Sequence, residues 1–375
     1  MEWFDLVFAL FVILLGAQLF TNGVEWIGEG FGLSEGMVGS VLAAVGTALP
    51  ETIVPLVAIL AGTHADGDEI GIGAILGAPF MLGTLAMAVI GVSALAYRKR
   101  RGGRVHARIV SADPQVIRQD LVFFLCAYPL ALAAGLWHVR PMHVALSVLL
   151  IVLYVFYVRR HLRAPADEKQ DEGAPATALA HPGGANPSHT KPHAAPGGSL
   201  EPDVQPLTLI NWYRRLTRTR APAAAKPPMW AAIAQTVFAL VLIIGAARIF
   251  VDAVSHVAVE LAVPSLVFSL LVAPIATELP EKLNGVLWIR RRKDTLAIGN
   301  LTGAMVFQST FPVTVGLLFT TWKLDQAGLI SGIIAIVAAL ITYVNIRFRG
   351  HLDARLMIGQ IVLYAGYVVY VVVRA

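Results

Sequence analysis

The strongest constraint on this chain is a set of long stretches that contain no charged side chain. Residues 70–97, 295–322 and 327–346 lack Asp, Glu, Lys and Arg, and the first basic residue is Arg98. The chain is 57% hydrophobic and only 14% charged, whereas soluble domains contain about 25% charged residues. Because a helix crosses a bilayer with about 20 apolar residues, the sequence predicts an integral membrane protein and argues against a soluble one.

The apolar stretches predict an all-α polytopic membrane protein with ten transmembrane helices. Continuous runs of this length are unlike the short alternating strands of a membrane β-barrel. The first run is long and has no basic start, so we expect a retained span rather than a signal peptide. The expected spans cover roughly residues 4–28, 37–62, 70–96, 120–137, 141–158, 230–254, 262–288, 295–320, 327–346 and 356–373.

The positions of Lys and Arg indicate an orientation for these spans. They gather between the third and fourth, the seventh and eighth, and the ninth and tenth expected spans. By the positive-inside rule these loops are cytoplasmic, and both termini then lie outside. We therefore expect a protein of the plasma (inner) membrane. Its net charge of +5 is interpreted as an orientation signal and not as a surface for nucleic acid.

Residues 159–228 differ in composition from the rest of the chain. They are rich in Pro, Gly, Ala and His, a composition that buries too little apolar surface to offset the entropy of ordering. We predict a flexible cytoplasmic linker between two five-helix halves, residues 1–158 and 229–375. The histidines of the linker are irregularly spaced, so we interpret them as solvated rather than metal-binding.

The two halves carry matching motifs. Residues 47–51 read Thr-Ala-Leu-Pro-Glu, and residues 277–281 read Thr-Glu-Leu-Pro-Glu. A second match aligns residues 72–78 with residues 298–304. Two halves of five spans each enter the membrane in opposite orientations. Such inverted repeats are typical of secondary transporters, whose binding site lies near the midplane where matching broken helices meet.

The repeated motifs place a carboxylate deep in two spans. Glu51 and Glu281 occupy equivalent central positions, and a charge at that depth costs several kcal/mol unless something pairs with it. Pro50 and Pro280 precede them, and a proline inside a helix removes a hydrogen bond and frees a carbonyl. Two carboxylates, threonine hydroxyls and freed carbonyls would face one point. Hard oxygen ligands of this kind suit Ca²⁺, Na⁺ or H⁺.

Two further groups of residues in the spans have a structural interpretation. Glycines four residues apart are most often contacts between closely packed membrane helices, and we expect packing of spans three and eight against the glutamate helices at Gly73, Gly77, Gly299 and Gly303. Aromatic side chains with a polar tip are common at membrane surfaces. We expect lipid-facing or interfacial positions for Tyr128, Tyr364, Tyr367 and Tyr370.

The motifs resemble those of the calcium/cation antiporter superfamily, whose best-known members are the sodium/calcium exchangers. The resemblance rests on residues 16–20, on the two motifs at 46–51 and 276–281, and on the segments 72–79 and 298–305. Duplicated motifs in inverted halves with a central hydrophilic loop are highly specific. The resemblance implies a ten-helix antiporter fold in which one central site is exposed alternately to each side.

Carried over by position, the family's ion site falls partly on ligating residues and partly on apolar ones. The essential glutamates correspond to Glu51 and Glu281, which are therefore the expected metal ligands, and the motif threonines to Thr47 and Thr277. The amide of one half is kept as Asn300, and Gln308 stands at a position that completes the site in exchangers. Side-chain ligands of the family are replaced at Ala48, Ala74, Ala78, Leu82, Ala304 and Glu278.

These replacements favour protons over sodium as the coupling ion. Several bound Na⁺ ions each need a cage of oxygens, and much of that cage is missing here. Glu278 adds a carboxylate three residues before Glu281, on the same helical face if the segment stays helical. Like charges this close cannot all ionise, so at least one carboxyl is expected to exchange protons near neutral pH. The alternative is a helix broken at Glu278, whose side chain would point into a water-filled vestibule.

We therefore expect a secondary cation antiporter, with transported Ca²⁺, Na⁺ or H⁺ in place of any cofactor and no covalent chemistry. One alternative is Na⁺/Ca²⁺ exchange with backbone carbonyls as ligands, and another is a regulatory paralogue that no longer transports. A membrane hydrolase would need a nucleophile with a positioned base. Neither Cys126 nor Ser309 has such a companion nearby in the chain. The expected partners are inorganic cations and the lipid bilayer.

Overall fold

The computed structural model describes residues 2–31, 43–61, 66–97, 108–137, 139–163 and 228–374. Within these ranges the chain is almost entirely helical. In chain order the helices are α1 (Glu2–Gly30), α3 (Ala43–Ala61), α4 (Gly67–Met81), the π-helix η2 (Leu82–Ala86), α5 (Met87–Ala96), α7 (Pro114–Ala134), α8 (Arg140–Arg163), α10 (Met229–Glu260), α11 (Ser265–Thr277), α12 (Leu279–Arg290), α13 (Asp294–Gln308), α14 (Phe311–Phe319), α15 (Gln326–Arg349), α16 (Ala354–Gly359) and α17 (Ile361–Arg374).

Eight helical segments in the described ranges are long and apolar enough to cross a membrane. They are Glu2–Gly28, Gly67–Ala96, Pro114–Ala134, Arg140–Arg160, Met229–Glu260, Asp294–Phe319, Gln326–Arg349 and Ala354–Arg374. Each overlaps one expected span. The other two expected spans, residues 37–62 and 262–288, contain shorter apolar helices at Glu51–Ala61 and Ser265–Ile275. The expected spans 37–62 and 262–288 are the two that carry the repeated glutamates.

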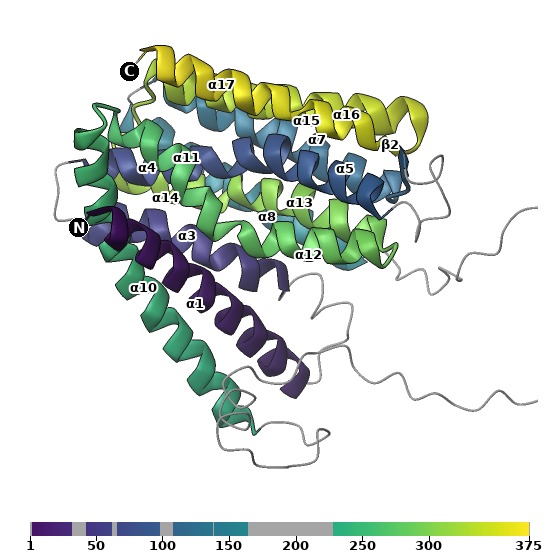
Figure 1. Cartoon of the computed structure of the whole chain (residues 1–375), viewed down its shortest axis with the longest axis horizontal. Helices are drawn as coiled ribbons and strands as arrows, with labels where there is room; N and C mark the ends of the chain where they lie inside the picture. The colour runs from purple at the N-terminus through teal and green to yellow at the C-terminus, as the bar shows by residue number, and fades with distance from the viewer. Residues whose placement is uncertain are drawn as a thin grey trace, which may run out of the picture.

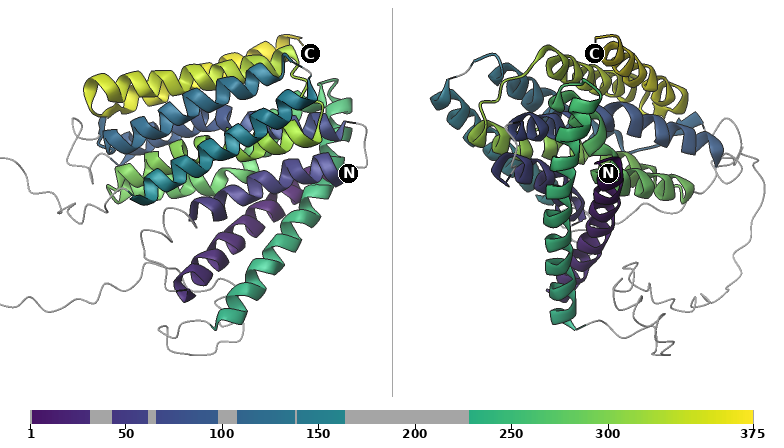
Figure 2. Two further views of the ribbon diagram at one scale, coloured as in Figure 1. Left: turned by 180° about the vertical axis from the view of Figure 1, so that it is seen from behind. Right: turned by 60° about the vertical axis from the view of Figure 1, so that its left-hand side comes forward.

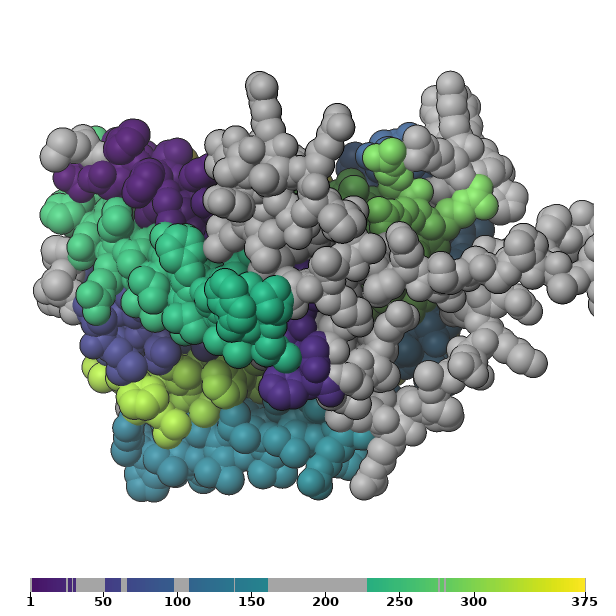
Figure 3. Space-filling model, turned by 90° about the horizontal axis from the view of Figure 1, so that it is seen from below, coloured from purple at the N-terminus to yellow at the C-terminus, as the bar shows by residue number. Residues whose placement is uncertain are grey.

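The first and the last described helices share one end of the bundle. Figure 1 shows the start of α1 and the end of α17 at the same end of the helix bundle. Helices α15, α16 and α17 form one side of the bundle, and α4, α5 and α7 lie beneath them. Figure 2 shows that α1 and α10 extend away from the rest as a separate pair, and Figure 3 shows the same pair side by side on one face.

The α1–α10 pair is antiparallel and closely packed through glycines. A Cβ on Gly16 would lie 2.6 Å from Ile243, and one on Gly23 would lie 2.3 Å from the Thr236 hydroxyl. The partner number falls as the α1 number rises, so the two helices run in opposite directions. The buried Gln235 amide on α10 donates hydrogen bonds to the Leu19 carbonyl at 2.9 Å and to the Asn22 side chain at 3.0 Å. The first helices of the two halves are thereby joined.

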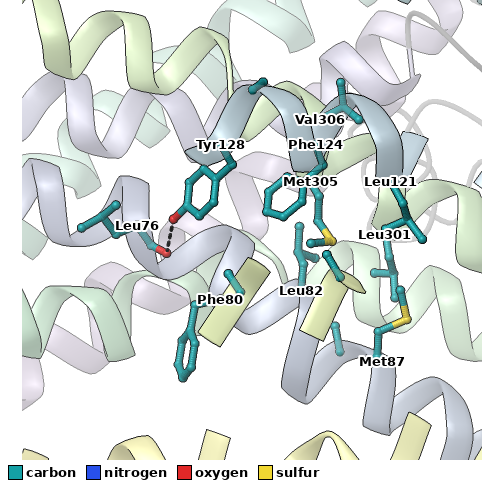
Figure 4. Packing of buried hydrophobic residues seen from close by; sticks show 14 of the residues in the cluster. Leu76, Phe80, Leu82, Met87, Leu121, Phe124, Tyr128, Leu301, Met305 and Val306 are labelled. Carbon is teal, nitrogen blue, oxygen red and sulfur yellow. Dashed lines mark hydrogen bonds between the residues drawn. The ribbon is translucent and has the colours of Figure 1, made fainter. Parts of the chain in front are cut away.

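The main core lies between α4, η2, α5, α7 and α13. Figure 4 shows Leu82 and Met87 next to side chains of α7 and α13 such as Leu121, Leu301 and Met305. Phe80 points the other way, and its ring stacks on that of Tyr364 in α17. Burying such side chains stabilises the bundle through close contact, since an apolar solvent supplies no hydrophobic driving force between membrane helices. The π-turn at η2 includes Thr84, whose hydroxyl donates to the Phe80 carbonyl at 2.6 Å.

Two tyrosines that were expected at the lipid boundary are in this core. Tyr128 is fully buried and donates a hydrogen bond to the Leu76 carbonyl at 3.5 Å (Figure 4). Tyr367 is also buried, 4.9 Å from the ring of Phe80. The expectation was wrong for both residues, because each hydroxyl finds a backbone carbonyl acceptor inside the bundle; Tyr367 bonds to Ala327 at 3.2 Å. Sequence pattern alone does not reveal such an acceptor.

The ends of three connecting segments meet at the end of the bundle opposite the termini. Strand β1 (Ile109–Val110) pairs antiparallel with β2 (Leu352–Asp353). Arg108 forms an ion pair with Asp353 at 2.7 Å, and Asp294 accepts a hydrogen bond from the Ser111 amide at 2.9 Å. The Arg108 guanidinium holds the pKa of Asp353 below its usual value. We call β1, β2 and the Arg108–Asp353 pair the loop clamp.

The predicted linker begins later than expected. Helix α8 continues to Arg163, so residues 159–163 belong to the helix rather than to the linker. Arg and Leu, which make up most of residues 159–163, are good helix formers and favour this continuation. Residues 164–227, on which the rest of that prediction falls, lie outside the described residues, and α10 begins at Met229.

Candidate ion-binding site

Helix α3 brings Glu51 into the interior of the bundle. The carboxylate is buried, with 6% of the residue exposed, and it accepts a hydrogen bond from the Gln308 amide of α13. The helix is continuous from Ala43 to Ala61, so Pro50 does not break it as expected. A proline costs an internal helix one hydrogen bond but fixes a helical φ angle, which a buried membrane helix tolerates. The side chains of Thr47 and Pro50 lie outside the described part of the chain.

The equivalent segment of the second half is interrupted at Glu278. Helix α11 ends at Thr277 and α12 begins at Leu279, with Glu278 between them at φ −99° and ψ 3°. Pro280 occupies the first turn of α12, where its missing N–H would have no helical partner in any case. The expected continuous span at residues 262–288 is therefore two helices. The break falls two residues before the proline, at the added carboxylate itself.

Three buried carboxylates lie in the region of this break. Glu278 and Glu281 are buried, with 0% and 1% of each residue exposed. Glu51 interacts electrostatically with both of them. The alternative of a helix broken at Glu278 was thus correct for the backbone. The side chain, however, is enclosed in protein and not in an open vestibule, since no surface of Glu278 is exposed.

Sequence reasoning missed the fourth charge of the site, Lys282. Its ammonium lies 3.7 Å from Glu278, donates to the Pro274 carbonyl at 3.2 Å and contacts the Met81 sulfur at 2.8 Å. It also interacts electrostatically with Glu51 and Glu281. The signal was present, because a lysine directly follows the second motif glutamate in an apolar span. Lysine is rare at such depth and marks a functional or paired position.

Several polar atoms of the site have no hydrogen-bond partner among the described residues. They are one carboxylate oxygen of Glu51, both of Glu278 and the amide oxygen of Gln308. Buried oxygens are normally satisfied, and a cluster of them lacking donors is the arrangement that a cation stabilises. No three His, Cys, Asp or Glu side chains in the described ranges are grouped to hold a metal by themselves. A cation here would need amide, hydroxyl or carbonyl oxygens as well.

The remaining predicted ligands are near the break to different degrees. Thr277 is buried on the last turn of α11, and its hydroxyl donates to the Ala273 carbonyl at 3.2 Å. That bond uses the hydrogen and leaves the oxygen able to accept or to ligate a cation. Gln308, at the end of α13, is 1% exposed and contacts the site directly through Glu51. Asn300 is two turns earlier on α13 and touches neither glutamate by any recorded bond.

The four predicted packing glycines divide into two pairs. A Cβ on Gly73 would lie 2.2 Å from the Leu266 carbonyl oxygen, and one on Gly77 would lie 2.1 Å from that of Leu270. These two allow α4 to press against α11 next to the site. At Gly299 and Gly303 the nearest described atoms would be 3.9 and 3.7 Å away, an ordinary distance. The packing expectation thus fits Gly73 and Gly77 and does not extend to the second pair.

Comparison with known proteins agrees with this geometry. The family described as "Sodium/calcium exchanger protein" matches residues 2–161 and 231–373. The chain belongs to this family. Family membership makes it an integral membrane protein related to transporters of inorganic cations, and the repeated glutamate motifs lie within the two matched ranges.

Individual relatives are distant. The chain is 27% identical over 112 residues to a "Putative antiporter CaxA" from Alkalimonas amylolytica, a match that spans 30% of this chain and 35% of that relative. Its fold is similar to the crystal structure of an H⁺/Ca²⁺ exchanger, CAX, with a TM-score of 0.66, 15% identity and coverage of 99% of this chain and 86% of that one. It is also similar to the sodium-calcium exchanger NCX_Mj, with a TM-score of 0.54, 17% identity and 98% coverage of both chains.

Proposed function

We propose that this protein is a secondary active antiporter that exchanges a cation, Ca²⁺ or another, for protons at a midplane site built on Glu51 and Glu281. Its membership of the exchanger family supports the antiporter class. The buried carboxylates at equivalent places in the two halves support the location of the site. Thr277, Glu278, Gln308, Asn300 and Thr47 are the further proposed contributors, and transport involves no covalent catalysis.

The proposal includes ten membrane crossings arranged as two inverted repeats. In it α3 and the α11–α12 pair cross the membrane in addition to the eight longer segments. Contacts between helices support the repeat because they come in equivalent pairs. Helix α4 packs on α11 as α13 packs on α3, and α15 packs on α4 as α7 packs on α13. The antiparallel α1–α10 pair adds to this, since inverted repeats make equivalent helices run in opposite directions.

The observation that carries proton coupling is the charge of the site. Glu51, Glu278 and Glu281 lie together with one ammonium, that of Lys282. With every group ionised, the three carboxylates and the one ammonium have a net charge of minus two. Such a charge cannot stay uncompensated in a buried site. One divalent cation or two protons would neutralise this charge equally. The exchange of one divalent cation for two protons would therefore move no net charge across the membrane.

The proposed setting is the plasma (inner) membrane. The loop clamp and the basic residues around it lie at one end of the bundle, and both termini lie at the other (Figure 1). The positive-inside rule assigns the clamp end to the cytoplasm. Both termini would then be outside and the linker inside.

The test uses purified protein in liposomes with one gradient imposed at a time. A pH gradient without Na⁺ should drive uptake of radioactive Ca²⁺ or of another divalent cation, and a Na⁺ gradient at equal pH should not. Uptake driven by Na⁺ alone would contradict proton coupling and support Na⁺/Ca²⁺ exchange, which the Pro274 carbonyl facing the site would assist. Absence of any cation uptake would support a regulatory protein without transport, in which Lys282 permanently takes the place of the cation.

A further inference from the structure

A pocket of ≈ 590 Å³ lies at the surface of the bundle, and none of its lining residues belongs to the candidate ion site. It is formed by the first turns of α7, the last turns of α8 and the end of α15. Figure 2 shows these helices side by side, and α7 contacts both of the others. The pocket is at the same end as the loop clamp, where the helices leave the membrane.

The polar half of this pocket is positively charged. Arg118 of α7 and Arg160 of α8 both line it, next to the amide side chain of Gln115. None of the described residues that line it is acidic. In the described part of the chain neither guanidinium has a recorded hydrogen bond or ion pair. The nearest carboxylate along α7, Asp120, is buried and faces away, accepting hydrogen bonds from Tyr157 at 3.0 Å and Thr302 at 2.6 Å.

The other half of the pocket is apolar and continues along the membrane. Val122, Phe123 and Tyr343 line it, and Val122 is 43% exposed. Two turns further along α7, Leu130 is also exposed. The surface therefore offers two guanidinium groups at the membrane boundary and a hydrocarbon track that leads from them toward the interior of the bilayer.

We propose that this pocket binds an anionic phospholipid, with the phosphate group on Arg118 and Arg160 and an acyl chain along Val122 and Phe123. Guanidinium groups match phosphate oxygens in geometry and charge, and basic pockets at the ends of membrane helices attract acidic headgroups. A free phosphate would use the arginines but gain nothing from the apolar track. A zwitterionic lipid has the same phosphate and acyl chains, but its headgroup also carries a cation that weakens the attraction to two guanidinium groups.

Lipid in this pocket would hold α7, α8 and α15 together. Asp120, on the turn of α7 that carries Arg118, joins α7 to α13 through Thr302, and α13 ends in Gln308, which bonds to Glu51. The pocket is thus connected to the ion site through packed helices. Binding of the lipid does not depend on the proposed transport, so the two proposals can fail separately.

The test measures lipid retention by the full-length protein. Delipidated protein is mixed with equal phosphatidylglycerol and phosphatidylcholine, and bound lipid is counted by native mass spectrometry. Wild type should prefer phosphatidylglycerol, and the double variant Arg118→Gln/Arg160→Gln should lower that preference by about 25-fold, since each of the two basic residues contributes about a factor of five near a charged surface. The double variant Arg159→Gln/Arg291→Gln removes two exposed charges outside the pocket and should retain it.

Three results would overturn the proposal. One is equal retention of the two lipids by wild type, and another is equal loss in the pocket and control variants. The third is displacement of the bound lipid by millimolar inorganic phosphate. That result would show that the pocket binds any phosphate anion and that the apolar residues add no preference for a lipid. Gel filtration and the melting temperature report folding of each variant, and all four arginines are exposed, so the substitutions are expected to preserve it.

Discussion

At the residue scale the two halves of the site differ in charge at two positions, because Glu278 stands where the first half has Ala48 and Lys282 stands where it has Thr52. The motif alignment that pairs Glu51 with Glu281 also pairs Thr52 with Lys282. Only the second half therefore places an ammonium among the carboxylates, in contact with Glu278 and the Pro274 carbonyl. This asymmetry sets the net charge that a transported ion must balance.

Removing either repeated carboxylate should abolish transport. Glu51→Gln and Glu281→Gln keep the size of the side chain but take away one negative charge, so the site no longer balances a divalent cation. We expect at least a hundredfold loss of pH-driven uptake in liposomes, because a buried charge pair in such a site contributes several kcal/mol. Unchanged uptake in a folded variant would place the site elsewhere.

Lys282 should limit how strongly the site binds divalent cations. Lys282→Met removes the internal positive charge and leaves three carboxylates, so the apparent affinity for a divalent cation should rise by tenfold or more, given the Coulomb energy at about 4 Å. Exchange should also become sensitive to membrane potential. Calorimetric titration and uptake under a potassium-diffusion potential measure the two effects.

The variant Glu278→Gln serves as the matched control for Lys282→Met. It should flatten the pH profile of uptake if Glu278 carries one of the exchanged protons, and it should lower divalent affinity where Lys282→Met raises it. A pH profile identical to that of wild type would make the third carboxylate a bystander. A Lys282→Met variant that folds but binds no cation would contradict the charge balance.

At the scale of helices, the sequence predicted the long elements better than the site-bearing ones. Charge-free runs predicted α4 to α5, α7, α13 to α14 and α15 because length and hydropathy alone define a span. Proline positions predicted a break near Glu281, but α3 passes through Pro50 and the actual break is at Glu278. A proline leaves a backbone carbonyl without its helical hydrogen-bond donor. Whether the helix is interrupted there depends on which neighbouring groups bind that carbonyl, and tertiary packing determines those neighbours.

The contact of α4 with α11 should depend on Gly77. Gly77→Ala places a methyl group 2.1 Å from the Leu270 carbonyl oxygen, a backbone atom that cannot move aside without separating the two helices. We expect a loss of stability of about 1–3 kcal/mol, measured as a lower melting temperature in detergent. Gly303→Ala is the matched control, because its Cβ would meet nothing closer than 3.7 Å in the described chain. Equal melting temperatures of the two variants would contradict this packing.

The loop clamp should stabilise the protein in a pH-dependent way. Since Arg108 lowers the pKa of Asp353, the pair contributes stability above the unfolded aspartate pKa of about 3.9, and that contribution is lost as pH falls through the lower folded pKa. Asp353→Asn should therefore melt about 2–4 °C below wild type at pH 7. The difference should vanish in strong acid and shrink in high salt. A difference that persists at acid pH would show that the ion pair is not its source.

At the scale of the whole molecule, the motifs predicted most of the buried charged and polar residues of the candidate site but not all of them. Glu51 and Glu281 were predicted from the repeat, Glu278 from its place three residues before Glu281, and Gln308 from the family resemblance. All four are buried. The buried position of Tyr128 was missed because it depends on a partner distant in sequence, the Leu76 carbonyl. Lys282 was overlooked although its place beside a motif glutamate in an apolar span was visible in the sequence. The sequence shows which residues are unusual for a membrane span. It does not show which of their side chains are in contact in the fold.

The number of protons released per cation taken up tests the central claim most directly. Purified protein in liposomes without Na⁺ is supplied with a divalent cation, and cation uptake and proton release are recorded in the same sample. The charge of the Glu51, Glu278, Glu281 and Lys282 group predicts about two protons per divalent cation and no net charge movement. Uptake with no proton release, or uptake only when Na⁺ is present, would contradict the account.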